Sequence, residues 1–193
     1  MQPVELYAQT IPSALGPLVM VTDAEALCAL EFTDCEARLT QLLSRRFGSV
    51  TLHPGADRFG IGTRIEDYFA GDLGAIDGIP VNPGGTEFQR TVWRALRSIP
   101  AGSTRSYAEL AAAIGRPTAP RAVGLANARN PVAIVIPCHR LVGSDAGLTG
   151  YAGGLERKRW LLCHEGALPP SSAHLTPLGP QRLQGVAHGN QGW

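Results

Sequence analysis

The stretch SYAELAAAIGRPTAPRAVGLANARNP, residues 106–131, predicts two short helices joined by a tight turn. Ser106 and Glu109 have the spacing of a capping box, in which two side chains satisfy free backbone amides at the start of a helix. That helix is expected to stop at Gly115, and Thr118 is expected to cap a second helix that runs to the Asn-Pro pair. This order is typical of a helix-turn-helix, a motif that also occurs in proteins that never contact DNA.

The sequence on either side of this motif continues the pattern. Residues 86–89, TEFQ, are a second capping box, followed by apolar residues at helical spacing. Beyond the motif, the apolar run at residues 132–135 predicts a buried strand that ends near Cys138. Residues 143–154 contain five glycines, which predict a loop, and residues 155–165 predict a further helix.

The first half of the chain has the pattern of an α/β unit. Turn residues separate short β-like segments, and two helical segments precede a linker rich in glycine and proline. The predicted strands are residues 4–10, 18–22 and 27–32, the helices are residues 37–47 and 64–70, and the linker is residues 74–85. We therefore expect an N-terminal domain at residues 1–80, a C-terminal domain at residues 85–167, and a tail at residues 168–193 whose composition indicates disorder.

Composition narrows the class of protein. The 193 residues are 44% hydrophobic, which suffices for one large domain or two small ones. The N-terminus has no basic segment followed by an apolar stretch, and no window approaches the ~18 apolar residues of a membrane span. The four cysteines form no C-x-x-C pair. We therefore expect a cytoplasmic protein with reduced thiols.

Charge is distributed unevenly along the chain. Residues 1–85 carry 5 Lys and Arg against 11 Asp and Glu, a net charge of −6. Residues 86–168 carry 11 against 5, a net charge of +6. A basic half favours a polyanionic partner such as nucleic acid, although a solvated basic surface has the same composition.

The sequence IPCHR, residues 136–140, places Cys138 beside His139, and three interpretations are open. A buried cysteine that only packs is the plain one. A metal site is disfavoured, because adjacent side chains of an extended chain point to opposite sides. A nucleophile needs a base near its thiol, whose free pKa is ~8.5. His139 would act as that base through a water molecule, and Glu165 would orient it.

Two longer stretches make the motif specific. They are GTEFQRTVWRALRSIPAGSTRSYAELAAAIG at residues 85–115 and RAVGLANARNPVAIVIPCHRLVGSDAGLTGYAGGLERKRWLLCHEG at residues 121–166. With NP before PCHR, and GYAGG and HEG after it, the chain closely resembles the O6-alkylguanine-DNA alkyltransferases, also called methylated-DNA–protein-cysteine S-methyltransferases. SALGPLVMV and YFAGDL extend the resemblance to about residues 13–167. It implies an N-terminal ribonuclease-H-like α/β domain followed by a C-terminal winged-helix-like helix-turn-helix domain.

The resemblance also implies a role for each matching residue. Cys138 corresponds to the alkyl acceptor, His139 to the base that acts through water, and Glu165 to the carboxylate that completes the relay. Asn130 corresponds to the asparagine that braces the turn after the recognition helix. Tyr107 corresponds to the tyrosine that donates a proton to the leaving guanine and helps to rotate the phosphate of the flipped nucleotide.

Further positions correspond to contacts with DNA and with the damaged base. Arg121 matches the arginine that enters the base stack from the minor groove, and Arg116 and Ser144 match positions that meet phosphates. The guanine pocket is implied to include Leu141, Tyr151 and Ala152, with the carbonyls of Cys138 and Leu141 accepting from the amino group of the base. Some relatives carry serine where this chain has Ala152, so only its backbone amide is available to O6.

The implied reaction is repair of DNA by direct reversal, with transfer of a methyl or larger alkyl group from O6 of guanine, or O4 of thymine, to Cys138. The thioether product resists hydrolysis, so each molecule is expected to react once. The implied partner is double-stranded DNA bound by a monomer, with no cofactor and no metal. Three alternatives are an alkyltransferase-like protein without transfer activity, a DNA-binding regulator, and a cysteine hydrolase.

Overall fold

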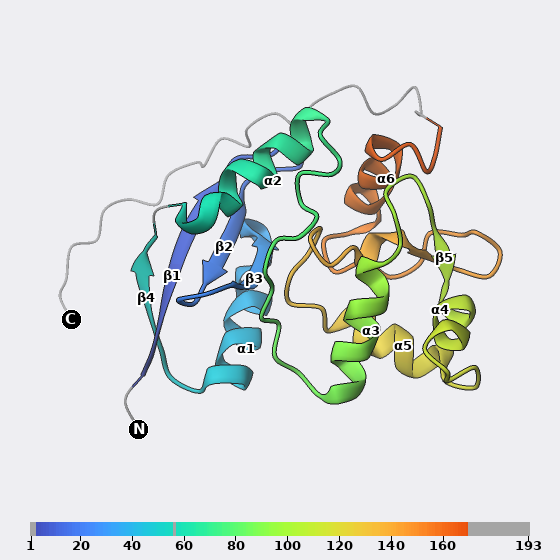
Figure 1. Cartoon of the computed structure of the whole chain (residues 1–193), viewed down its shortest axis with the longest axis horizontal. Coiled ribbons are helices and arrows are strands. Elements are labelled where there is room, and N and C mark those ends of the chain that lie inside the picture. The colour runs from blue at the N-terminus through green and yellow to red at the C-terminus, as the bar shows by residue number, and fades with distance from the viewer. Residues whose placement is uncertain (1–2, 56, 170–193) are drawn as a thin grey trace.

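A computed structural model describes residues 3–55 and 57–169, and Figure 1 shows a mixed α/β fold. The N-terminal part contains a four-stranded sheet of order β3-β2-β1-β4. Its elements are β1 (Val4–Ile11), β2 (Leu18–Thr22), β3 (Leu27–Phe32), α1 (Glu36–Phe47), β4 (Val50–Pro54) and α2 (Ile61–Ala70). Neighbours β1, β2 and β3 are antiparallel, whereas β4 runs parallel to β1. The predicted bounds of β2 and β3 are confirmed, and β4 was not predicted.

The sheet has buried residues on both of its faces. On one face, Leu6 and Val21 pack with Leu39 and Leu43 of α1, whose i, i+4 spacing places both leucines on one side of the helix. Residues of opposite parity point to the other face, because successive side chains of a strand alternate. That face packs against α2 and continues into the C-terminal half as one large apolar core.

The C-terminal half is mainly helical. Its elements are α3 (Glu87–Arg97), β5 (Arg105–Ser106), α4 (Tyr107–Ala113), α5 (Pro120–Ala128), β6 (Leu141–Val142) and α6 (Leu155–His164). Both predicted capping boxes are present, at Thr86 with Gln89 and at Ser106 with Glu109. The two short strands β5 and β6 pair in parallel. The predicted helix-turn-helix corresponds to α4 and α5.

Two local predictions are wrong. Thr118 does not cap α5, because the helix begins at Pro120 with Ala119 at the N-cap position and no side-chain cap; a proline in the first turn has no amide that needs a partner. The apolar run at residues 132–135 is buried but forms turns and not a strand. Val132 makes an isolated bridge with Leu30, and Ile134 then has a φ of 69°, which reverses the chain.

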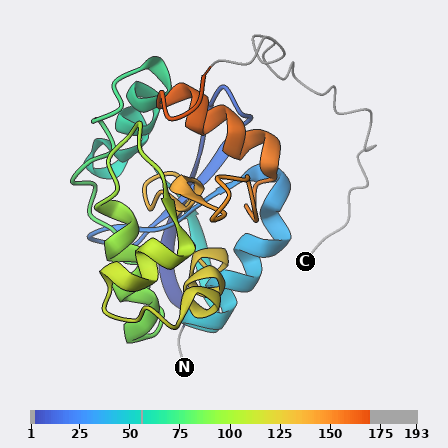
Figure 2. The same ribbon diagram turned by 90° about the vertical axis from the view of Figure 1, so that its right-hand side faces the viewer.

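The edge of β3 joins the two halves of the molecule. Val81 of the linker bridges to Leu27, and Val132 bridges to Leu30. Figure 2 shows α6 beside α2, so the last helix of the C-terminal half also packs on the N-terminal half. No helix in residues 3–55 and 57–169 is long and apolar enough to cross a membrane. Most of the tail predicted to be disordered, residues 170–193, lies outside the described residues.

Candidate active site

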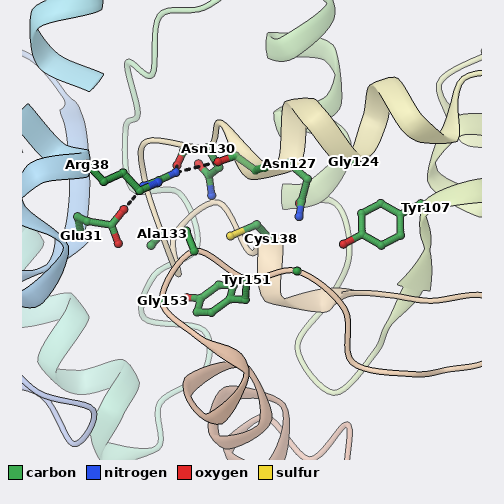
Figure 3. Close-up of a pocket in the computed structure, with 13 residues that line it drawn as sticks. Glu31, Arg38, Tyr107, Gly124, Asn127, Asn130, Ala133, Cys138, Tyr151 and Gly153 are labelled. Carbon is green, nitrogen blue, oxygen red and sulfur yellow. Dashed lines mark hydrogen bonds and ion pairs between the residues drawn. The ribbon is translucent and has the colours of Figure 1, made fainter. Parts of the chain in front are cut away.

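A cavity of about 310 Å³ lies where the two halves meet. Figure 3 shows Cys138 on the cavity wall, with Tyr107 on one side and Tyr151 on another. Glu31 of β3 and Arg38 of α1 line the part of the cavity that the N-terminal half provides. The cavity therefore draws on α1, α4, α5 and the glycine-rich loop. It brings together Cys138, Tyr107, Asn130, Tyr151 and Ala152 of the predicted site residues.

Cys138 is the first residue of a single 3₁₀ turn, η3 (Cys138–Arg140), so it is not at the end of a strand as predicted. Its side chain is nearly buried, and its backbone amide donates to the carbonyl of Ile136 at 2.8 Å. Burial raises the pKa of the Cys138 thiol, although a hydrogen bond with Asn130 and the positive charge of Lys158 oppose that effect. The thiol therefore needs a base before it can act as a nucleophile.

His139 is fully buried, and its Nε2 lies 3.0 Å from Oε1 of Glu165. Burial lowers the pKa of His139, despite the opposing effect of Glu165, so the imidazole is neutral near pH 7. A neutral ring that faces a carboxylate through Nε2 carries its proton on that atom. Nδ1 is then the basic nitrogen, and it has no hydrogen-bond partner among the described residues.

Glu165 lies directly after α6 and is held as an anion. Arg140 donates to it twice, from Nε to Oε2 at 2.9 Å and from Nη2 to Oε1 at 2.8 Å. The hydroxyl of Tyr68 donates to Oε1 at 2.7 Å. Burial raises the pKa of this carboxyl, but the hydrogen bonds from His139 and Arg140 and the positive charge of Arg140 outweigh burial and hold the pKa well below its ordinary value.

Asn130 braces the turn that leads to Cys138. Its Nδ2 donates to the carbonyls of Val132 at 3.3 Å and Ile136 at 2.8 Å, and its Oδ1 accepts from the amide of Val132 at 3.0 Å. One side chain thus satisfies three backbone groups that a strand would otherwise have paired. These hydrogen bonds take the place of the β-sheet pairing that was expected for residues 132–135.

Tyr107 opens α4 immediately after its N-cap, and its hydroxyl points towards the cavity in Figure 3. The ring lies against Gly124 of α5, where an added Cβ would be 3.7 Å from the ring. The two helices of the helix-turn-helix therefore meet at Tyr107, and Asn127, one turn of α5 further on, lines the same cavity.

Arg157 and Phe32 hold the glycine-rich loop, residues 143–154, in place. Arg157 of α6 donates to Asp34 at 3.0 and 2.8 Å and to the carbonyl of Gly153 at 3.3 Å, and its guanidinium stacks on Phe32. A Cβ on Gly153 would lie 2.9 Å from the Phe32 ring, so only glycine fits this close approach. The loop then places the buried hydroxyl of Tyr151 in the cavity wall, without a hydrogen-bond partner among the described residues.

The remaining predicted site residues are not among those that line the cavity. Leu141 is fully buried in β6, and its carbonyl accepts from the ammonium group of Lys158, whose pKa burial lowers to about 8. Arg116 is exposed between α4 and α5, Ser144 is exposed in a turn, and Arg121 is exposed at the second position of α5.

Sequence reasoning missed several residues that the structure brings to the site. Arg38 of α1 donates to Glu31 and to the carbonyls of Ala128 at 3.0 Å and Asn130 at 2.8 Å, at the end of α5. Tyr68 lies within the quoted stretch YFAGDL, and Arg140 within PCHR, but neither motif by itself indicated a contact with Glu165. The long-range contacts of these residues leave no periodic signal in the sequence.

Comparison with known proteins indicates the family of this chain. Residues 87–167 match the model of the 6-O-methylguanine DNA methyltransferase, DNA binding domain. The chain is 47% identical to the methylated-DNA–protein-cysteine methyltransferase of Salmonella typhimurium over 170 residues, which cover 84% of this chain and 97% of that protein. The chain belongs to the methylated-DNA–protein-cysteine methyltransferase family.

Solved structures of family members have the same fold. The Mycobacterium tuberculosis O6-methylguanine methyltransferase superposes with a TM-score of 0.70 at 40% identity, covering 87% of this chain and 97% of that one. A complex of the Mycobacterium tuberculosis protein with DNA has a TM-score of 0.71 at 43% identity, covering 85% and 94%. The family assignment therefore covers both halves of the fold and not only the helix-turn-helix.

Proposed function

We propose that this protein repairs DNA by direct reversal, transferring an alkyl group from O6 of guanine to Sγ of Cys138. The observation that carries the proposal is a buried cysteine that lines a cavity and is followed in the chain by a histidine whose Nε2 faces a carboxylate. Family membership supplies the reaction class, since relatives at 42–47% identity are methylated-DNA–protein-cysteine methyltransferases.

The surroundings of the other cysteines favour Cys138 as the acceptor. Cys28 bonds to the carboxylate of Asp23 at 3.2 Å, and burial raises the pKa of its thiol to about 12. Cys163 bonds to the carbonyl of Pro169 at 3.4 Å. Cys163 also precedes a histidine, His164, but of the four cysteines only Cys138 lines the cavity between the two halves.

In the proposed reaction, the thiol is deprotonated, the thiolate displaces guanine from the alkyl carbon, and the leaving base is protonated. Nδ1 of His139 takes the thiol proton through a water molecule, and Glu165 stabilises the resulting imidazolium. The thiolate attacks the alkyl carbon, a C–S bond forms, and the bond from carbon to O6 breaks with its electron pair going to guanine. Tyr107 donates a proton to the leaving base. The product is a thioether that water does not cleave, so one molecule performs one transfer.

The proposed partner is double-stranded DNA with the damaged nucleotide flipped into the cavity. Arg121 fills the space left in the stack, α5 lies in the minor groove, and Arg116 and Ser144 contact phosphates. The guanine is enclosed by Tyr151 and the backbone of Ala152, and carbonyls of Cys138 and Leu141 accept from its amino group. The positive charge of residues 86–168 supports this docking.

The wider description of the molecule is also a proposal. We assign residues 1–80 to a ribonuclease-H-like domain and residues 85–167 to a winged-helix-like domain, in a monomer that works in the cytoplasm without a cofactor. O4-alkylthymine is a second substrate. The four-stranded sheet with α1 on one face and the capped helix pair α4 and α5 support the two-domain division.

A single-turnover experiment tests the function. Excess duplex oligonucleotide carrying O6-methylguanine should add one methyl group per protein molecule, on the peptide that contains Cys138, as read by mass spectrometry. Cys138→Ser should retain binding of the alkylated duplex and lose transfer, whereas Cys163→Ser should transfer normally. An unmodified Cys138 peptide from folded, DNA-bound protein would overturn the proposal.

A further inference from the structure

Tyr68 connects the N-terminal half of the molecule to the proposed relay. It lies near the end of α2 and is fully buried. Its hydroxyl donates to Oε1 of Glu165 at 2.7 Å, although the two residues are 97 positions apart in the chain. The carboxylate that orients His139 is therefore held in part by a side chain of the N-terminal half.

The contact completes the set of donors around one oxygen. Oε1 of Glu165 accepts from Tyr68, from Nε2 of His139 and from Nη2 of Arg140, and Oε2 accepts from Nε of Arg140. Each donor withdraws electron density from the carboxylate and makes it a weaker base. Burial and the charge of Glu165 raise the pKa of Tyr68, so its hydroxyl keeps its proton and acts as a donor.

Packing fixes the direction of this hydroxyl. The ring of Tyr68 meets the rings of Phe69 and His164 edge-on, at centroid distances of 5.4 and 5.2 Å. His164 in turn stacks on Trp160 and hydrogen-bonds through Nε2 to the carbonyl of Tyr68 at 2.8 Å. A ring held on two sides has few alternative rotamers, so the hydroxyl stays aimed at Glu165.

We infer that Tyr68 is a positioning residue of the alkyl-transfer reaction, which fixes the Glu165 carboxylate against His139 and limits how strongly that carboxylate attracts a proton. The inference rests on the proposed function. It assigns the N-terminal half a direct part in the proposed relay, because the other donors to Glu165 all come from the C-terminal half.

The inference predicts a change in pH dependence. The groups around His139 are Glu165, Arg140, Lys158 and the ring of Tyr151. Loss of the tyrosine hydroxyl alters Glu165 alone among them. The carboxylate then has one donor fewer and attracts the imidazolium more strongly, so His139 is protonated at a higher pH and is lost as a base earlier on acidification.

The test compares single-turnover transfer from an O6-methylguanine duplex across pH in three proteins. Tyr68→Phe keeps the ring and removes the donor, so we expect transfer at neutral pH to slow by about tenfold, the value of one hydrogen bond to a charged group. Its acid limb should shift to higher pH, and its affinity for the duplex should stay within about twofold, because Tyr68 is fully buried and does not line the cavity.

His164→Phe is the matched control. It keeps an aromatic ring beside Trp160 and edge-on to Tyr68, so the Tyr68 hydroxyl stays aimed at Glu165, but it removes the bond to the Tyr68 carbonyl. It disturbs the same contact between α2 and α6 without touching the carboxylate. We expect a lower melting temperature and an unchanged pH profile.

A second substitution covers the case in which Tyr68→Phe does not fold. Fluorotyrosine at position 68 keeps the hydroxyl and makes it a stronger donor, so the acid limb should shift to lower pH. A wild-type pH profile in each Tyr68 variant that folds would overturn the inference and leave Tyr68 as a packing residue. Failure of the unaltered protein to alkylate Cys138 would instead overturn the proposed function.

Discussion

Glu165 is a charge in the protein interior, and its neighbours determine that it remains ionised. Arg140 supplies a fork of two hydrogen bonds, which suits the planar carboxylate. Removing one partner of such a buried pair leaves an uncompensated charge, at a cost of about 3–5 kcal/mol. The pair is therefore both part of the proposed relay and a structural requirement for the end of α6.

The lowered pKa of His139 gives a second prediction for a single residue. The base must be neutral, and because burial lowers its pKa below the ordinary 6.5, the neutral form persists as pH falls through that value. We expect single-turnover transfer to decline only below pH 6.5, in a rate profile measured between about pH 5 and 8. An acid limb centred above 6.5 would contradict the proposed state of His139.

Substitution of the base checks the origin of that limb. His139→Gln keeps a polar side chain but has no basic nitrogen, so transfer should fall by about a hundredfold or more. The remaining rate should lose its acid limb, because the titrating group is gone. Persistence of the limb in this variant would assign it to another residue.

At the scale of single elements, side-chain hydrogen bonds mark the start of α4, whereas α5 starts at Pro120 without a side-chain cap. The side chain of Glu109 accepts from the amide of Ser106 at 2.7 Å, and the hydroxyl of Ser106 accepts from the amide of Glu109 at 3.1 Å. Thr118 has the same kind of side chain and is exposed, but α5 starts two residues later. Residue type therefore predicted an N-cap at both Ser106 and Thr118, but only Ser106 has the hydrogen-bond geometry of an N-cap.

A pair of alanine substitutions separates these two positions. Ser106→Ala removes a working cap directly before Tyr107 and should lower the free energy of unfolding by about 1 kcal/mol. Thr118→Ala should change it by less than roughly 0.5 kcal/mol. Urea unfolding measures both values. Equal losses in the two variants would indicate that Thr118 caps α5 after all.

At the scale of the whole molecule, the two halves share one apolar core but differ in charge. The acidic half contributes the sheet, α1 and α2, and the basic half contributes α3 to α6. Arg38 and Arg157 cross the boundary in opposite directions, to carbonyls at the end of α5 and to Asp34. The cavity at this boundary therefore depends on both halves being docked.

The charge division predicts the salt dependence of DNA binding. If Arg116 neutralises one phosphate, Arg116→Gln should reduce the slope of log K against log salt by about 0.9. Arg45→Gln removes the same charge from α1, in the acidic half, and should leave the slope unchanged. Fluorescence anisotropy at several salt concentrations measures both slopes. A reduced slope in the Arg45 variant alone would place the DNA on the other half.

Local patterns in the sequence were enough to predict much of this protein. The bounds of β2 and β3, the capping boxes of α3 and α4, and the turn at Gly115 depend on neighbours within a few residues. The motif around Cys138 could also be identified from the sequence, because the family resemblance rests on contiguous residues. These features need no knowledge of what packs against them.

Only the tertiary structure decided the features that depend on distant partners. The run at residues 132–135 became a turn because Asn130 took the backbone groups and Ile134 reversed the chain, whereas its composition suits a strand equally well. Tyr68 and Glu165 meet because α2 packs on α6, and Arg38 reaches the end of α5 because α1 lies beside it. Hydrogen bonds between residues about 90 to 100 positions apart carry no local signature, since packing of the whole core brings their partners together.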